Sequence, residues 1–266
     1  MKRWLVFTDL DGTLLDESYS WDLAQPAIDL LRSASIPIIL NSSKTAAEME
    51  NLRIKMKLET YCIAENGSII TKNYTNSENQ IFDTSVRDQL VEIAGKLRRE
   101  HNYKFEGYMD WCIDDLIQLT GLTGYEAECS MKRQATEPII WNDTQDRLFD
   151  FMNQLRKLNV VLIKGGQFMH LMIANQSKGK AMEKVVNKFK LSDPDSTWHT
   201  VALGDSQNDF SMIERADVGI LIPKKKDNIS VKLLPNARRA SFPSTKGWNE
   251  AVLNWFSEIN KEVLCE

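Results

Sequence analysis

Near its start the chain reads Trp4-Leu5-Val6-Phe7-Thr8-Asp9-Leu10-Asp11-Gly12-Thr13, an apolar run that stops at two acids and a glycine. This pattern predicts a short buried strand that ends in a polar turn. Residues two apart on an extended strand point to the same side, so Asp9 and Asp11 are expected to lie close together. Two neighbouring carboxylates repel each other, and a bound cation would relieve that repulsion.

Further strands and helices alternate along the two ends of the chain. Short apolar runs that predict strands occupy residues 36–40, 61–64, 200–203 and 218–222. Helical patterns occupy residues 21–32, 45–56, 178–190 and 247–259, the last with Trp248, Val252, Trp255 and Ile259 facing inward. Strands that alternate with helices favour right-handed crossovers and a parallel sheet, so the predicted fold class is α/β with a Rossmann-like core.

The middle of the chain breaks this alternation. Two amphipathic helices are predicted around residues 86–97 and 148–158, and strand-like runs occupy 138–141, 160–163 and 168–173. Two helices with a few antiparallel strands indicate a separate α+β insert. We therefore predict a catalytic core formed by residues 1–82 and 174–266, and an α+β cap domain formed by residues 83–173.

Composition narrows the class of protein. The 266 residues are 42% hydrophobic and 26% charged, which excludes a disordered chain, a collagen-like fibre and a coiled-coil rod. A net charge of −4 disfavours a nucleic-acid partner. The sequence has no apolar stretch long enough for a membrane helix and no signal-peptide pattern, so we expect a cytoplasmic protein with no membrane partner. Wide spacing of the four cysteines argues against a disulfide framework or a zinc site; they are Cys62, Cys112, Cys129 and Cys265.

Polar side chains follow the predicted strands at four places. They are Asp9 with Asp11, Ser42, Lys178 at a helix start, and Asp205 with Asn208 and Asp209. Ligands of parallel α/β sheets bind at the carboxyl ends of the strands, so we expect one shared site. Oxygen donors without a histidine or cysteine favour Mg²⁺, which commonly accompanies a phosphate substrate. A hydroxyl from Ser42 and an ammonium group from Lys178 suit that phosphate.

These motifs resemble those of the haloacid dehalogenase superfamily of phosphatases. The stretch from Asp9 to Leu15 is similar to its first motif. Ser42, Lys178 with Gly179, and the run Gly204–Asp209 look like its second, third and fourth motifs, in the same order. The long gap between Ser42 and Lys178 resembles the type IIB, Cof-like subgroup, which inserts an α+β cap there.

A closer resemblance is to the mannosyl-3-phosphoglycerate phosphatase family. It rests on Asn41-Ser42-Ser43-Lys44-Thr45, on Ala64-Glu65-Asn66-Gly67 and on Gly165-Gly166-Gln167-Phe168-Met169-His170. That family usually carries arginine where this chain has Gln167. The resemblance implies a mannosyl- or glucosyl-3-phosphoglycerate substrate, a glycosylglycerate product of the compatible-solute kind, and a cap that closes over the sugar.

The resemblance also implies residue roles. Asp9 would attack phosphorus and form an aspartyl-phosphate, and Asp11 would act as general acid and base. The implied catalytic set is Asp9, Asp11, Ser42 and Lys178. The implied Mg²⁺ set is Asp9, Asp11, Asp205, Asp209 and Asn208, the last two orienting Lys178 or water around the metal. The implied substrate-binding set is Ser43, Lys44, Asn66, Arg133, Glu137, Gln167 and His170. The expected partner is a small phosphorylated sugar, bound by a monomer or a homodimer.

Each motif also has a structural interpretation. Asp9 and Asp11 could form a turn, and Ser42, Asn208 and Asp209 could cap helices. Lys178 could be a solvated helix lysine, and Lys180 is the alternative residue for the same role. Arg133 with Glu137 could be a surface pair, His170 a core residue, and Lys224-Lys225-Lys226 solvated loop charges. Other functions for the same motifs are a sucrose-phosphate phosphatase, a broad sugar phosphatase, a phosphomutase or a non-catalytic scaffold.

Overall fold

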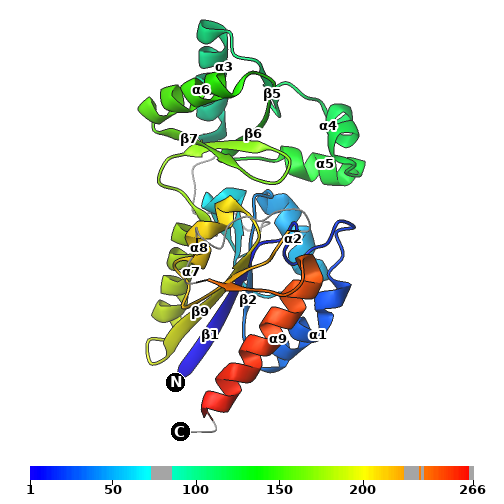
Figure 1. The fold of residues 1–266 in the computed structure, drawn as a ribbon, viewed down its shortest axis with the longest axis vertical. Helices are drawn as coiled ribbons and strands as arrows, with labels where there is room; N and C mark the ends of the chain where they lie inside the picture. Colours follow the sequence, from blue (N-terminus) through cyan, green and yellow to red (C-terminus); the bar gives the residue numbers. More distant parts are fainter. Residues whose placement is uncertain (73–85, 225–233, 235–236, 264–266) are drawn as a thin grey trace. The chain divides into compact units, whose positions relative to one another are not determined.

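The computed structural model describes residues 1–72, 86–224, 234 and 237–263 (Figure 1). Cys265, Lys225, Lys226 and the predicted domain boundary at residue 82 lie outside the described residues. The chain divides into two compact units. The first contains residues 1–42, 58–61 and 178–266, and the second contains residues 43–57 and 62–177. No helix in the described ranges has both the length and the apolar character needed to cross a membrane.

A seven-stranded sheet carries the strand ends that the sequence singles out. Its order is β11-β10-β9-β1-β2-β3-β4. The strand bounds are β1 Lys2–Thr8, β2 Ile38–Asn41, β3 Cys62–Ala64, β4 Ile69–Thr71, β9 Thr197–Gly204, β10 Val218–Leu221 and β11 Arg238–Arg239. β1 pairs in parallel with both β2 and β9, and Thr8 lies opposite Leu40 on one side and Leu203 on the other. The carboxyl ends of these three strands therefore meet at one edge.

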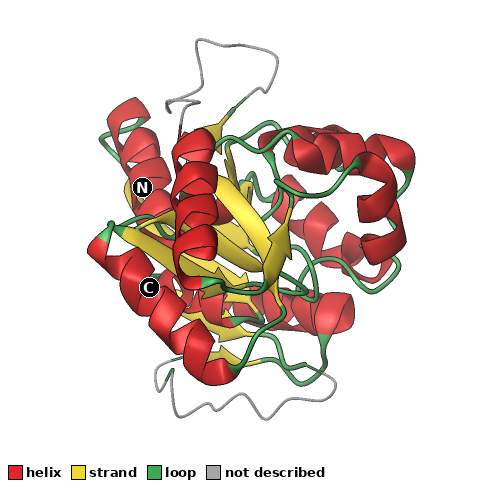
Figure 2. Cartoon of the chain, turned by 90° about the horizontal axis from the view of Figure 1, so that it is seen from above, coloured by secondary structure: helices red, strands yellow, loops and turns green. Residues whose placement is uncertain are grey.

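Helices cover both faces of the sheet in the first unit, as Figures 1 and 2 show. α1 (Gln25–Ser33), which follows a 3-10 turn (Asp22–Ala24), lies with α9 (Ser244–Val263) on one face. α7 (Lys178–Ser192) and α8 (Phe210–Ile213) lie on the other. A strand covered on both faces is apolar throughout instead of alternating, which explains why Leu5, Val6 and Phe7 are all fully buried. Trp248, Val252 and Trp255 point inward, as their spacing predicts, while Ile259 is only half-buried.

The second unit contains a four-stranded antiparallel sheet of order β5-β6-β8-β7. The strands are β5 Phe105–Gly107, β6 Thr136–Trp141, β7 Val160–Lys164 and β8 Met169–Ile173, and the helices are α2 Ala46–Lys55, α3 Val86–His101, α4 Ile113–Thr120, α5 Gly124–Met131 and α6 Gln145–Lys157. Leu90, Phe151 and Leu171 belong to the hydrophobic core of this unit. The predicted α/β fold with an α+β insert is thus confirmed.

The prediction of only two helices in the insert was wrong, because α4 and α5 also form there. Each has eight residues, about two turns, which is too short for a clear apolar period. Their ends carry a local signal instead. The Thr123 side chain accepts from the Glu126 N–H in a capping box, and Gly121 ends α4 with a left-handed φ of 73°.

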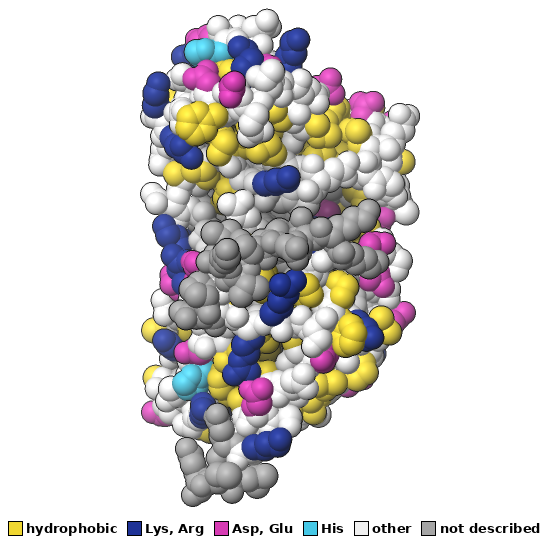
Figure 3. All heavy atoms as spheres, in the orientation of Figure 1, with side chains coloured by type: hydrophobic (Ala, Val, Ile, Leu, Met, Phe, Trp, Pro, Cys, Tyr) yellow, Lys and Arg dark blue, Asp and Glu magenta, His cyan; other side chains and the backbone are white. Residues whose placement is uncertain are grey.

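Charged side chains of both signs are interspersed with apolar ones on the face drawn in Figure 3. This mixture matches the near balance of 33 basic and 37 acidic residues in the sequence.

Candidate functional site

The backbone at the end of β1 is held from several directions. The Asp9 N–H donates to the Leu203 carbonyl at 2.9 Å, which extends the pairing with β9 by one residue. The Thr8 hydroxyl donates to the Asp9 carbonyl at 2.7 Å, and the Trp248 indole N–H donates to that hydroxyl at 2.9 Å. Asp9 therefore leaves the strand in one defined direction.

The turn after Asp9 depends on a glycine. The Gly12 N–H donates to the Leu15 carbonyl, and the Leu15 N–H donates to the Leu10 carbonyl, which closes a tight loop. Gly12 has a φ of 79°, and a Cβ added there would lie 2.8 Å from Asp205 Oδ2. A side chain at residue 12 would therefore strain the backbone and press on the carboxylate of Asp205.

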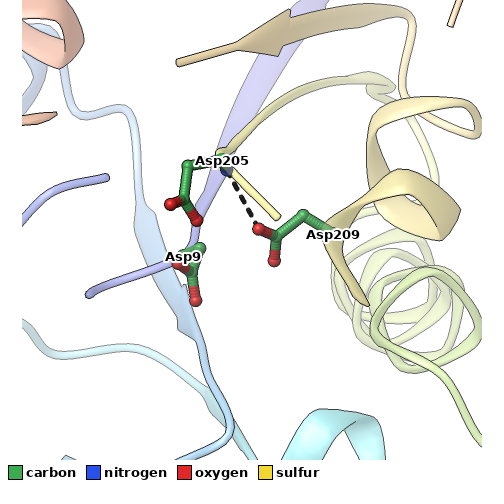
Figure 4. A group of neighbouring side chains, drawn as sticks. All are labelled: Asp9, Asp205 and Asp209. Atoms are coloured by element: carbon green, nitrogen blue, oxygen red, sulfur yellow. Dashed lines mark hydrogen bonds between the residues drawn. The ribbon is translucent and has the colours of Figure 1, made fainter. Parts of the chain in front are cut away.

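Three carboxylates gather beside this turn (Figure 4). Asp9, Asp205 and Asp209 each place an oxygen within 4.8 Å of the others. Their exposed fractions are 6%, 5% and 0%, so three acids share a space with little water. Such a group is costly unless positive charge balances it.

Lys178 supplies part of that charge. Its Nζ lies 2.6 Å from Asp9 Oδ1 and 2.6 Å from Asp209 Oδ1, and its side chain is 1% exposed. Burial lowers the pKa of Lys178, but the charges and hydrogen bonds of Asp209 and Asp9 outweigh burial, so its pKa lies above the ordinary value. Lys178 therefore stays protonated and holds the two carboxylates together.

Asp209 is enclosed by donors. Its Oδ2 accepts from the Asp205 N–H at 3.0 Å and from the Ser206 N–H at 2.9 Å, while its Oδ1 accepts from Lys178. A Cβ added to Gly204 would lie 2.3 Å from the Cβ of Asp209, so only glycine permits this approach. Burial and the negative charge of Asp9 raise the pKa of Asp209 to about 7, against the opposing effect of Lys178. Its contacts fit a residue that orients Lys178 and the turn at Asp205.

Asp205 has a different set of partners. Its Oδ1 accepts from the Ser206 hydroxyl at 2.8 Å, and Lys224 Nζ lies 3.2 Å from its Oδ2. Burial and the charge of Asp9 raise the pKa of Asp205, while Lys224 and Ser206 oppose that rise. The expectation that Lys224 is a solvated loop charge was therefore wrong, because its ammonium group reaches the carboxylate cluster.

Ser42 and Asn41 lie at the end of β2. Ser42 is 1% exposed, in keeping with a side chain that faces the interior of the first unit. Asn41 is fully buried, and its amide donates to the Lys178 carbonyl at 3.2 Å. Asn41 thereby fixes the first residue of α7, and so the origin of the Lys178 side chain.

A hollow of about 790 Å³ opens beside the cluster in the first unit. Asp11, Gly12, Asp205 and Lys224 form part of its wall. Asp11 is exposed and lies two residues after buried Asp9 in the sequence, which suits a group that exchanges protons with a reactant.

In the second unit, Glu65 of the Ala64-Glu65-Asn66-Gly67 motif is a buried centre of hydrogen bonds, a role that the motif alone did not predict. Its side chain is 0% exposed. Oε1 accepts from the Gln134 N–H at 2.9 Å, and Oε2 accepts from the Ala135 N–H at 3.0 Å and the Thr136 hydroxyl at 2.7 Å. This carboxylate ties the turn after β3 to the start of β6.

Arg133 is held by the same network. Its Nη1 donates to the Thr136 hydroxyl at 3.0 Å and to the Ser43 carbonyl at 3.2 Å. The guanidinium carbon lies 4.9 Å from the centre of the Tyr108 ring, which is within the range of a cation–π contact. Its Nε is buried and has no hydrogen-bond partner among the described residues. The arginine is thus held in place by its Nη1, while its buried Nε donates to no other described residue.

Glu137 does not form the surface pair with Arg133 that was one of the two interpretations. It is 0% exposed, and its Oε2 accepts from Arg87 Nε at 2.9 Å while Oε1 accepts from the Met109 N–H at 2.6 Å. Burial raises the pKa of Glu137, and Arg87 partly offsets that effect. These contacts give Glu137 a structural function in the unit.

The other predicted substrate residues of this unit differ in exposure. Gln167 is exposed and donates to the Leu119 carbonyl at 3.0 Å, while His170 is 3% exposed on β8. Lys44 Nζ lies 3.9 Å from Glu48 Oε1, and the Lys44 carbonyl accepts from the Glu65 N–H. Asn66 is buried with a left-handed φ of 58°.

Known proteins resemble this chain in sequence and in fold. The sequence pattern of the haloacid dehalogenase-like hydrolases matches residues 6–232. This chain belongs to that family. It is 33% identical over 270 residues to the glucosyl-3-phosphoglycerate/mannosyl-3-phosphoglycerate phosphatase of Persephonella marina, covering 97% of this chain and 98% of the relative. The family and this relative together make the chain a phosphoric monoester hydrolase.

Solved structures show the same fold. A haloacid dehalogenase-like hydrolase from Bacteroides thetaiotaomicron aligns with a TM-score of 0.68 and 16% identity, covering 95% of this chain and 99% of its own. The sucrose-phosphatase of Synechocystis sp. PCC6803 aligns with a TM-score of 0.62 and 16% identity, covering 96% and 98%.

The structure thus brings Asp9, Asp205, Asp209 and Lys178 into contact range in the first unit. Asp11 lies in the turn after β1, and Ser42 directly follows β2. Asn208 lies in the 3-10 turn Gln207–Asp209, half-buried. Ser43, Lys44, Asn66, Arg133, Glu137, Gln167 and His170 all belong to the second unit.

Proposed function

We propose that the protein is a Mg²⁺-dependent phosphomonoesterase that works through an aspartyl-phosphate on Asp9. The observation that carries this proposal is the contact of Lys178 Nζ with Asp9 Oδ1, beside Asp205 and Asp209. An ammonium group there fixes the direction of the Asp9 carboxylate, which a carboxylate nucleophile requires.

Asp11 serves as the acid and base. Asp9 attacks the phosphorus atom of the substrate. Asp11 donates a proton to the departing oxygen of the sugar or glycerate. Asp11 then takes a proton from the water that attacks the aspartyl-phosphate. Its exposed position on the wall of the hollow permits both transfers. Ser42 and Lys178 hold the phosphate oxygens that do not react.

The donor set fits a magnesium ion. Three carboxylates gather here among the described residues, and the glycine at residue 12 leaves the Asp205 oxygen uncovered by a Cβ. Asp9, Asp205 and the main-chain carbonyl of Asp11 would hold it, with Asp209 and Asn208 in support. When bound, the ion offsets negative charge on the phosphoryl group. Asp209 has donors on both oxygens, so its own contribution is to orient Lys178 and the Asp205 turn.

We further propose mannosyl-3-phosphoglycerate or glucosyl-3-phosphoglycerate as the substrate. The name of the 33% identical relative supports this choice. Arg133 supports it as well, because a fixed guanidinium with a buried, unpartnered Nε suits a carboxylate such as that of glycerate.

A substrate panel tests both parts. We expect phosphate release from mannosyl- and glucosyl-3-phosphoglycerate to exceed release from unsubstituted 3-phosphoglycerate, sucrose 6-phosphate and hexose phosphates. We expect EDTA to stop it and Mg²⁺ to restore it. Preference for sucrose 6-phosphate would refute the substrate, and full activity in EDTA would refute the metal.

A further inference from the structure

Lys224 follows β10 and reaches the carboxylate cluster from the loop. Its Nζ donates to the Ser206 hydroxyl at 2.8 Å and lies 3.2 Å from Asp205 Oδ2. The Ser206 hydroxyl in turn donates to Asp205 Oδ1 at 2.8 Å. The ammonium group therefore contacts Asp205 both directly and through its neighbour.

The two lysines of the cluster have different partners. Lys178 is 1% exposed and bridges Asp9 and Asp209, whereas the Lys224 side chain is 34% exposed and meets Asp205. The chemistry of Asp9 requires the first lysine. The second contacts the carboxylate that the proposed function assigns to the metal, and its side chain is partly open to solvent.

We propose that Lys224 sets the affinity of this site for its divalent cation, because its ammonium group competes with the cation for Asp205. The inference rests on the proposed function. A lysine this close repels a cation held by the same carboxylate, and partial exposure weakens that repulsion without removing it. If Lys224 only ordered Asp205, its loss would change metal affinity in the opposite direction, because metal binding would weaken.

Direct titration with Mn²⁺ tests the proposal, with free Mn²⁺ followed by electron paramagnetic resonance and Mg²⁺ used as competitor. The test variant is the whole chain with Lys224→Met, which keeps most of the side-chain length and removes the charge. We expect Lys224→Met to bind Mn²⁺ roughly tenfold more tightly than the wild type at low salt, with a smaller gain at high salt. Lys224→Arg keeps the charge and is expected to bind like the wild type.

Lys246 provides the matched control. It lines the same hollow, and its Nζ lies 3.6 Å from the centre of the Phe242 ring. Lys246→Met removes the same charge from the same hollow, and we expect Mn²⁺ affinity within about twofold of the wild type.

The outcomes separate this proposal from the proposed function. If Lys224→Met binds Mn²⁺ no more tightly than Lys246→Met, or more weakly than the wild type, the competition is refuted. If the wild type and Asp205→Asn bind Mn²⁺ equally, the magnesium site itself is refuted, and the role of Lys224 with it.

Discussion

Replacing Glu65 with glutamine removes one charge from the buried network of the second unit while keeping the shape of the side chain. The Glu65 carboxylate accepts three hydrogen bonds, from the Gln134 and Ala135 N–H groups and from the Thr136 hydroxyl. An amide has only one oxygen, so its NH₂ group must face at least one of these donors. Glutamine can adopt the same backbone angles, so the comparison isolates the hydrogen bonds.

The expected loss of stability follows from those contacts. One hydrogen bond to a charged acceptor is lost, which costs about 1.5–3 kcal/mol, and the others change from charge-assisted to neutral. The free energy of unfolding should fall by about 3 kcal/mol in all. At about 2–4 °C per kcal/mol for a chain of this size, Tm should fall by about 6–12 °C.

Thermal unfolding followed by circular dichroism measures this effect, and Glu126→Gln is its control. Glu126 is also bonded to its neighbours, since its Oε2 accepts from the Thr123 N–H and hydroxyl, but it is exposed. Glutamine serves a capping box as well as glutamate does, so that change should cost about 0.5 kcal/mol or less. If the two variants lose the same amount of stability, the reasoning from burial fails.

Three further predictions concern the site. Asp9→Asn should lower phosphate release by about a thousandfold or more while the circular dichroism spectrum is unchanged, and near-normal turnover would contradict the nucleophile. Burial raises the pKa of Asp209 to about 7, so this group binds a proton more readily when folded. The pKa of Asp209 in the unfolded chain is near 4. As pH rises from about 4 to about 7, ionisation of Asp209 therefore lowers the stability of the folded protein. The Tm gain from Mg²⁺ over EDTA should then grow from pH 5 to pH 7.5, and a gain independent of pH would contradict this. Arg133→Ala should raise KM for glycosyl-3-phosphoglycerate about tenfold, near 1.4 kcal/mol, and KM for p-nitrophenyl phosphate much less; equal changes would exclude a substrate role.

The strand ends could be predicted from the sequence because each combines a contiguous apolar run with the acid or lysine that follows it. Asp9 and Asp205 stand directly after buried strands, and parallel pairing brings such positions together without further information. Lys178 could also be predicted from its local sequence, because it begins a helix with a clear apolar face.

The supporting residues could not be predicted in this way. The partners of Glu65 lie 69 or more residues away in the sequence, and the partner of Asn41 lies 137 residues away. The partners of Lys224 lie 18–19 residues away. Their local sequence carries no mark of those contacts, and Lys224 in a run of lysines is typical of a solvated loop. Such contacts depend on tertiary packing, which periodicity does not encode.

The hydrogen bonds that position Asp9 join segments that are 240 residues apart in the sequence. Trp248, in the last helix, donates to Thr8, whose hydroxyl donates to the Asp9 carbonyl. During synthesis, the first strand leaves the ribosome long before α9 exists. The proposed nucleophile therefore reaches its final setting only after α9 has been synthesised and has packed against β1.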